Sequence, residues 1–325
     1  MTQRTRWIVR LLVAGACAVT LPGFAAQTYP DRAIRLIIPF PPGGTADTIL
    51  RVLAQKLADA FAPQMVVDNR PGGGTIIATE IGARANADGY TLLAVSTAYT
   101  VNPSLYKKLP YDPDKSFAPV TLVAAAPNVL VVNPAVPVAS VAELTAYAKS
   151  KPRQLNFGSA GNGTSTHLAG EMFKGMAKVD ITHIPYKGDA PAITDLISGQ
   201  TQILFIGWGP IEQHVKSGRV KALAVTSASP TPLVPNLPTV ASGGLPNFVS
   251  SVWSGLMVPA GTPANVIARL QSEVAKILKQ SETRDRIIGM GYEPIGSAPA
   301  EFGAFVRAET ARWAMVIKEA GIRVE

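Results

Sequence analysis

The sequence predicts an α/β protein of two lobes, each a doubly wound sheet flanked by helices. Short apolar runs, typical of buried strands, alternate with longer segments whose apolar residues recur at helical spacing. Three turns rich in glycine and small polar residues each fall between such a strand and the next helix. Ligands of doubly wound sheets gather beyond the C-terminal strand ends, so these turns mark the expected binding edge.

The first turn follows a predicted buried strand at residues 36–38. Prolines and glycines at 39–44 turn the chain before a helical pattern begins at Ala46. Proline fixes φ, while paired glycines allow positive φ and close approach of a ligand. A helix N-terminus presents unpaired N–H groups and the positive end of the helix dipole, so this turn suits an anion. Thr45 adds a hydroxyl, and Asp47 is expected to cap the first helical turn.

The same turn also fits a plain connection between strand and helix, and the residues alone leave both interpretations open. No lysine follows the glycines, as it would in a Walker phosphate loop. The G-x-G-x-x-G spacing of dinucleotide-binding turns is also missing. We therefore expect no cofactor.

The N-terminus predicts export to the periplasm. Three arginines in the first ten residues precede an apolar run at 11–19, and small residues at 23–25 suit cleavage. The run is too short to span a bilayer, so residues 1–26 are predicted to be a signal peptide. Cys17 lies in a poor lipobox, which leaves a lipoprotein as the lesser alternative.

Charge and cysteine content favour a small anionic ligand over nucleic acid. Removing the leader deletes three arginines and no acids, so the formal net charge falls from +8 to +5. It also removes the single cysteine, which excludes disulfides from the mature chain. About 300 residues can still bury a large core. No long run of lysine and arginine occurs, so the spread positive charge is expected to attract small anionic molecules through its long-range electrostatic field.

The first lobe is predicted to begin with alternating strands and helices. Residues 49–61 form an amphipathic helix with polar side chains on its outer face. The elements that follow are a strand at 65–67, a glycine-rich turn at 72–74, a helix at 75–84 and a strand at 90–95. Ser96 and Thr97 then lie at the binding edge. Residues 102–115 are rich in Pro, Tyr, Lys and Asp, which predicts a surface loop.

The second lobe repeats this alternation after a capping box formed by Ser140 and Glu143. Its predicted elements are a helix to 150, a strand at 155–157, a small-residue turn at 158–165 before a helix, a strand at 182–185, a helix at 191–198, a strand at 202–206, a short helix ending at Gly218 and a strand at 220–225. Dense prolines at 229–246 predict an ordered segment without regular structure.

Two segments are predicted to connect the lobes. Residues 118–132 are almost wholly apolar and long for one strand, which suits a segment that leaves one lobe and enters the other. Residues 252–258 are predicted as a strand that returns. The first lobe then comprises residues 27–126 and 250–325, and the second comprises residues 127–249.

Several long and uncommon blocks identify a family: YPDRAIRLIIPFPPGGTADT, VVDNRPGGGT, FGSAGNGTSTHLAGEMFK, HIPYKG and RWAMVIKEAGI. They resemble the extracytoplasmic solute receptors of tripartite tricarboxylate transporters, the Bug-type receptors, from Tyr29 to the C-terminus. The resemblance implies a monomeric periplasmic binding protein of type II-like, Venus-flytrap architecture and no enzymatic activity. It also implies that a small carboxylate, held by backbone amides, hydroxyls and waters, is delivered to membrane subunits.

The expected ligand-binding residues lie on the turns and strand ends of the binding edge: Phe40, Gly43, Gly44, Thr45, Asp47, Ser96, Thr97, Ser159, Gly163, Thr164, Ser165, His167, Tyr186, Lys187 and Trp208. Trp208 departs from the family pattern, which places a polar residue, usually Asp or Asn, after the strand that ends at Phe205. It is expected either to pack in the core or to contact the ligand. For Lys187, a cationic group at the cleft and a solvated side chain on a loop are equally consistent with the sequence.

Metal binding and catalysis are the remaining alternatives. His167 and Glu171 share a helical spacing, but two ligands do not make a metal site and no H-E-x-x-H motif occurs. A structural or cleft-polar His167 is favoured, and no metal is expected. No G-x-S-x-G elbow supports Ser159 or Ser165 as a nucleophile. An exported enzyme acting on a small organic acid therefore stays the alternative to a receptor.

Overall fold

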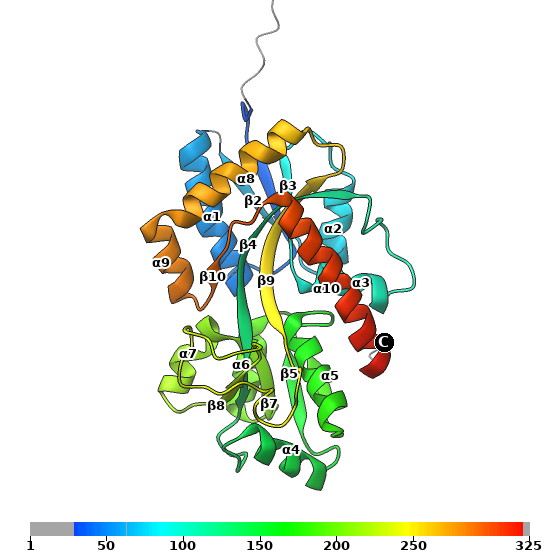
Figure 1. The fold of residues 1–325 in the computed structure, drawn as a ribbon, viewed down its shortest axis with the longest axis vertical. Coiled ribbons are helices and arrows are strands. Elements are labelled where there is room, and N and C mark those ends of the chain that lie inside the picture. The colour runs from blue at the N-terminus through cyan, green and yellow to red at the C-terminus, as the bar shows by residue number, and fades with distance from the viewer. Residues whose placement is uncertain (1–28, 63, 321–325) are drawn as a thin grey trace, which may run out of the picture.

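Two lobes are joined by two long strands, β4 (Phe117–Val132) and β9 (Ser251–Pro259), in the computed structural model, which describes residues 29–62 and 64–320 (Figure 1). The predicted signal peptide lies outside these residues. Within the described part, none of the helices combines the length and apolar character that a membrane span requires.

The first lobe is a mixed sheet between two helical layers. Strand β1 (Ile34–Ile38) pairs in parallel with β2 (Met65–Asn69) and β3 (Thr91–Val95), and β3 pairs antiparallel with β9. Leu36 and Ile38 face a core shared with α1 (Thr45–Phe61) and α8 (Ala264–Lys279). Ile37 between them faces a core shared with α2 (Ile76–Ala83), α3 (Thr97–Leu105) and α10 (Pro299–Ala320). This alternation follows from the period of two residues along a strand.

The helices of this lobe, which also include α9 (Ser281–Gly289), lie on either side of the sheet in Figure 1. The lobe further contains the short 3-10 helix η1 (Gly73–Thr75) and the short strand β10 (Glu293–Pro294), which pairs antiparallel with β4.

The second lobe repeats the layered arrangement. Strand β5 (Asn156–Ser159) pairs in parallel with β6 (Thr182–Pro185) and β7 (Ile203–Gly207), while β7 and β8 (Lys221–Val225) pair antiparallel with β4. One core packs under α4 (Val141–Ser150) and α5 (Ser165–Ala177). The other packs under α6 (Asp189–Ser198) and α7 (Trp208–Lys216).

The apolar segment predicted at 118–132 is a single strand. Strand β4 pairs with β9 through Pro127, with β7 from Asn128 and with β8 from Val129, so it belongs to both sheets. Its register with β9 shifts twice, between Pro119 and Thr121 and between Leu122 and Ala124. Such irregularities bend and twist a strand, which lets a strand of 16 residues follow two differently oriented sheets.

The prediction of a surface loop from residue 102 was wrong at its start, because helix α3 continues to Leu105. Asn102 is fully buried, and its side-chain amide donates to the Gly74 carbonyl at 2.9 Å. Pro103 lies in the last turn, where it removes one backbone hydrogen bond without ending the helix at once.

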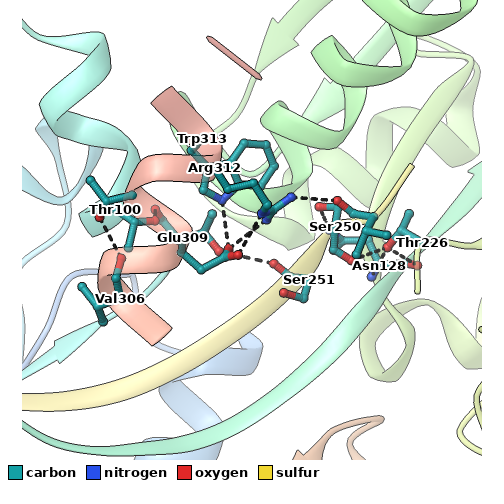
Figure 2. A network of polar contacts seen from close by, with 12 residues as sticks. Thr100, Asn128, Thr226, Ser250, Ser251, Val306, Glu309, Arg312 and Trp313 are labelled. Atoms are coloured by element: carbon teal, nitrogen blue, oxygen red, sulfur yellow. Dashed lines mark hydrogen bonds and ion pairs between the residues drawn. The ribbon is translucent and has the colours of Figure 1, made fainter. Parts of the chain in front are cut away.

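A buried polar network ties together the two segments that cross between the lobes (Figure 2). The Thr226 hydroxyl accepts from the Asn128 N–H at 2.8 Å and donates to the Ser250 carbonyl at 2.6 Å. From α10, Arg312 Nη1 donates to the Val249 carbonyl at 3.0 Å, while its Nε and Nη2 donate to the two carboxylate oxygens of Glu309. The entry to β9 is therefore held from both lobes.

The lobes also touch where the start of α7 meets the turn between α9 and β10. A Cβ built on Gly209 would overlap the Met290 carbonyl oxygen, and one on Gly291 would lie 3.0 Å from the Trp208 Cβ. Glycine at both positions is what lets the two backbones approach.

We predict that Gly209→Ala separates this contact, because its methyl group needs the space that the Met290 carbonyl fills. The variant should melt at a lower temperature and give a larger radius of gyration by X-ray scattering. Gly289→Ala is the matched control, since a Cβ there meets nothing within 4 Å. Equal behaviour of the two variants would show that the contact contributes nothing.

Candidate functional site

A cavity of about 970 Å³ lies between the lobes. The first lobe contributes the turn at residues 40–44 together with Ser96 and Thr97. The second contributes residues 164–166 and 187–191. Asn128 of β4 and Trp253 of β9 line it from the crossing strands. The cavity thus collects residues from both sheets at the edge where the sequence predicted binding.

Asp47 holds the first turn in shape. One of its carboxylate oxygens accepts from the Gly43 N–H at 2.9 Å and from Arg51 at 2.8 Å, and the other accepts from Asn69 at 2.8 Å. Asn69 also donates to the Phe40 carbonyl at 2.9 Å, so both ends of the turn are anchored. The Gly43 N–H is consequently engaged within the protein rather than offered to a ligand.

The same contacts keep Asp47 ionised in a buried position. Burial alone would raise the pKa of its carboxyl, but the hydrogen bonds from Arg51, Asn69 and Gly43 outweigh that effect and lower the pKa. The side chain is only 2 % exposed, so its charge is neutralised by protein groups. Asp47 thus shapes the turn from behind and does not line the cavity.

The turn before α5 has a comparable internal network. The Thr164 hydroxyl donates to the Gly161 carbonyl at 2.6 Å and accepts from the His167 N–H, which caps the helix. The Gly163 N–H donates to His167 Nδ1 at 3.1 Å. The N–H groups of Ser165 and Thr166, in the first helical turn, have no intrahelical acceptor, as at any helix start. Both residues line the cavity.

Two stacked histidines support this turn from below. The rings of His167 and His183 lie 4.2 Å apart, and His183 Nε2 is 2.6 Å from the Ser159 hydroxyl. Burial lowers the pKa of both imidazoles, to about 4 for His167 and about 3 for His183, and nearby positive charge on Lys174 adds to this. Both rings are therefore neutral at physiological pH.

The histidine pair does not present a nucleophile to the cavity. Ser159 is fully buried, lies outside the cavity wall, and also accepts from the Gly161 N–H at 3.2 Å. Glu171 brings a carboxylate near both histidines, with the three ligand atoms within 4.8 Å of one another. One nitrogen of each ring already forms a hydrogen bond with the turn, so the geometry supports a structural role for the histidine pair.

The predicted site residues divide into two groups. Those in the cavity wall are Phe40, Gly43, Gly44, Ser96, Thr97, Thr164, Ser165 and Lys187. Those outside it are Asp47, Ser159, Gly163, His167, Tyr186 and Trp208. Thr45 opens α1, and its side chain lies outside the described part. The glycine-rich turn at 72–74, one of the three turns of the expected binding edge, does not line the cavity. Its Gly74 carbonyl accepts from Asn102 instead.

Tyr186 and Trp208 both pack with the core under α6 and α7. The Tyr186 hydroxyl donates to Asp195 at 2.6 Å, which ties the connection before α6 to the middle of that helix. Trp208 is the first residue of α7, where its Cβ faces Gly291 of the other lobe. Neither aromatic ring forms part of the cavity wall.

Sequence reasoning missed the cavity residues of the crossing strands and of α6 and α7. Asn128 and Trp253 are fully buried, and Asn128 Oδ1 and Trp253 Nε1 have no hydrogen-bond partner within the described residues. A buried polar atom of this kind calls for a ligand or water. Each sits inside an apolar strand, and the sequence carries no signal that distinguishes it from core.

We predict that Asp47→Ala destabilises the protein by about 1–3 kcal/mol, because it leaves buried donors without an acceptor. Denaturant unfolding measures this change. Asp59→Ala removes a carboxylate from the exposed face of the same helix and should stay within about 0.5 kcal/mol of the parent. Similar losses for both variants would contradict a specific role for Asp47.

We also predict that stability falls as the pH drops from about 6.5 towards 4. Unfolded histidines take up protons below their ordinary pKa of 6.5, whereas the buried His167 and His183 stay neutral until about 4 and 3. The unfolded state then binds more protons, which lowers the free energy of unfolding. His183→Gln should flatten this part of the curve relative to the parent, and the two should run parallel above pH 7.

Comparison with known proteins agrees with this architecture. Residues 49–322 match the family model described as the tripartite tricarboxylate transporter family receptor. Protein BugT of Bordetella pertussis is 35 % identical over 98 % of this chain and 99 % of its own length.

Solved structures agree with this match. One R. palustris protein, solved with adipate, is 36 % identical with a TM-score of 0.87 over 91 % of this chain and 99 % of its own. MatC from Rhodopseudomonas palustris, with bound malate, is 31 % identical with a TM-score of 0.83 over 89 % of this chain and 100 % of its own. The chain belongs to the family of tripartite tricarboxylate transporter receptors.

Proposed function

We propose that this receptor captures a small carboxylate-bearing solute between its lobes in the periplasm and delivers it to the membrane subunits of a tripartite tricarboxylate transporter. The observation that carries the proposal is the meeting of two helix N-termini, those of α1 and α5, at one cavity. Each presents N–H groups and the positive end of a helix dipole, which favour an anion. The adipate and malate of the two solved relatives are both carboxylates.

The polar groups of the crossing strands suit the same ligand. The buried Trp253 indole N–H is a donor without an acceptor in the described residues, so a carboxylate oxygen or a water that reaches it can accept its hydrogen bond. Asn128 Oδ1 is the complementary acceptor for a ligand hydroxyl or a water. A carboxylate between the lobes would thus contact both lobes and the strands that join them.

Closure around the solute is the second part of the proposal. We assign residues 27–126 and 250–325 to one lobe and residues 127–249 to the other, so that the chain crosses at β4 and before β9. Rotation about these crossings would bring the α1 and α5 N-termini together on the solute. The receptor acts as a monomer, and the signal peptide at 1–26 is removed on export.

Gly44 offers a direct test of the anion site. Its φ of −72° and ψ of 165° suit any residue, and a Cβ would meet only the Pro41 carbonyl at 3.9 Å. Of the two paired glycines expected to allow positive φ, Gly44 does not use it, so a larger residue fits the backbone there. The constraint of a positive φ belongs to Gly43, whose φ is +88°.

We predict that carboxylates at about a hundred times their Kd stabilise the protein by about 2.7 kcal/mol, whereas neutral sugars do not. Gly44→Val should weaken their binding by screening the helix N-terminus while keeping the melting temperature of the free protein. Thr164→Val should cost about 0.5–1.5 kcal/mol of binding, because the turn loses a hydrogen bond that shapes it.

Thr310→Val, the same change on α10 away from the cavity, serves as the control. Calorimetric titration of each variant supplies the affinities. Unchanged affinity in both Gly44→Val and Thr164→Val would place the ligand elsewhere, and a panel without any stabilising carboxylate would reject the function.

A further inference from the structure

The cavity extends beyond the space between the lobes, along α6 and α7 of the second lobe. Helix α6 lines it with Ala190, Ile193, Thr194 and Ile197, which are spaced to share one helical face. Helix α7, which packs beside α6 (Figure 1), lines it with Pro210 and His214 at a spacing of four. One face of each helix therefore borders the same cavity, and we name this part the distal groove.

The direction of the distal groove follows from the sheet. Strands β6 and β7 both pair in parallel with β5, and α6 and α7 follow the C-terminal ends of β6 and β7. Both helices therefore start near the edge that carries the carboxylate site and run away from it. Residues at their C-terminal ends, Ile197 on α6 and His214 on α7, mark the far end of the groove.

The wall of the groove is largely apolar along α6, and a basic residue borders its far end. Ile193, Ile197 and Pro210 supply the apolar surface. Arg219 lies at the far end beside His214, because its backbone N–H donates a hydrogen bond of 2.9 Å to the His214 carbonyl. Arg219 is an exposed residue, and its guanidinium has no ion-pair or hydrogen-bond partner among residues 29–62 and 64–320. A cation without a partner at the end of an apolar groove is suited to an acidic group on an apolar chain.

We propose that the distal groove is a subsite for the body and second acidic group of an elongated dicarboxylate. The inference rests on the proposed function, since the first carboxylate occupies the helix N-termini of α1 and α5. The ten residues of α6 extend about 15 Å. An extended chain advances about 1.2 Å per bond, so a ligand that reaches Arg219 has a spacer of roughly eight to twelve bonds.

The test is a calorimetric titration of the mature protein with linear dicarboxylates of four, six, eight, ten and twelve carbons. Each methylene buried in the groove should tighten binding about fourfold, until the chain reaches Arg219. Linear monocarboxylates of the same lengths separate the apolar contribution from that of the second acid. They should bind the protein at least tenfold more weakly than the long dicarboxylates.

Arg219→Gln should weaken binding of the long dicarboxylates about tenfold and leave the four-carbon acid unchanged. The matched control is Arg284→Gln, which changes an exposed arginine on α9, outside the cavity wall. Ile197→Ser should lower the gain per methylene, because it replaces an apolar wall residue with a polar one.

The outcomes separate this inference from the function beneath it. Carboxylate binding without any dependence on length would overturn the distal subsite and leave the receptor function intact. Equal binding of long monocarboxylates and dicarboxylates would reject the acid site at Arg219. An equal effect of Arg219→Gln on short and long acids would show that the arginine acts only through long-range electrostatic attraction, and it would reject a direct contact with the second acidic group.

Discussion

The hydrogen-bonded ladder along β4 is the constraint on which the rest of the structure depends. One half of this strand pairs with β9 and the other half with β7 and β8, so both sheets are built on a single backbone. The cavity lies where the strand changes partners, and Asn128, the first residue paired with β7, is part of its wall. Any relative motion of the lobes must therefore bend or twist this strand and rearrange the polar network around Thr226.

The turns that face the cavity are held from behind by buried polar groups. Asp47 anchors the turn at 40–44, and His167 and Thr164 anchor the turn before α5. Asp47 and His167 lie outside the cavity wall, whereas Thr164 both caps α5 and lines the cavity, so the N–H groups at the helix starts stay oriented without a ligand. A site arranged in advance loses less entropy on binding than one that must be ordered by its ligand.

Charge in the cavity is divided between backbone and side chains. Near the crossing strands, helix N-termini provide diffuse positive potential that accepts a carboxylate from several directions. Along α6 and α7, the positive charge is localised on the Arg219 guanidinium, at a position set by the chain. The helix N-termini suit the carboxylate that many solutes share, whereas Arg219 suits a second acidic group that only some solutes carry.

The sequence by itself determined the family, the order of nearly all elements and the turns that line the first part of the cavity. These features depend on local patterns: helical periodicity around Leu53, a capping box at Ser140 and glycines with positive φ at Gly43 and Gly163. Only the tertiary structure decided which polar groups face the cavity and which support it, because Asp47 and Ser96 look alike until their partners are known. It also revealed Trp253 and Arg219, whose roles depend on strands and helices brought together from distant parts of the chain.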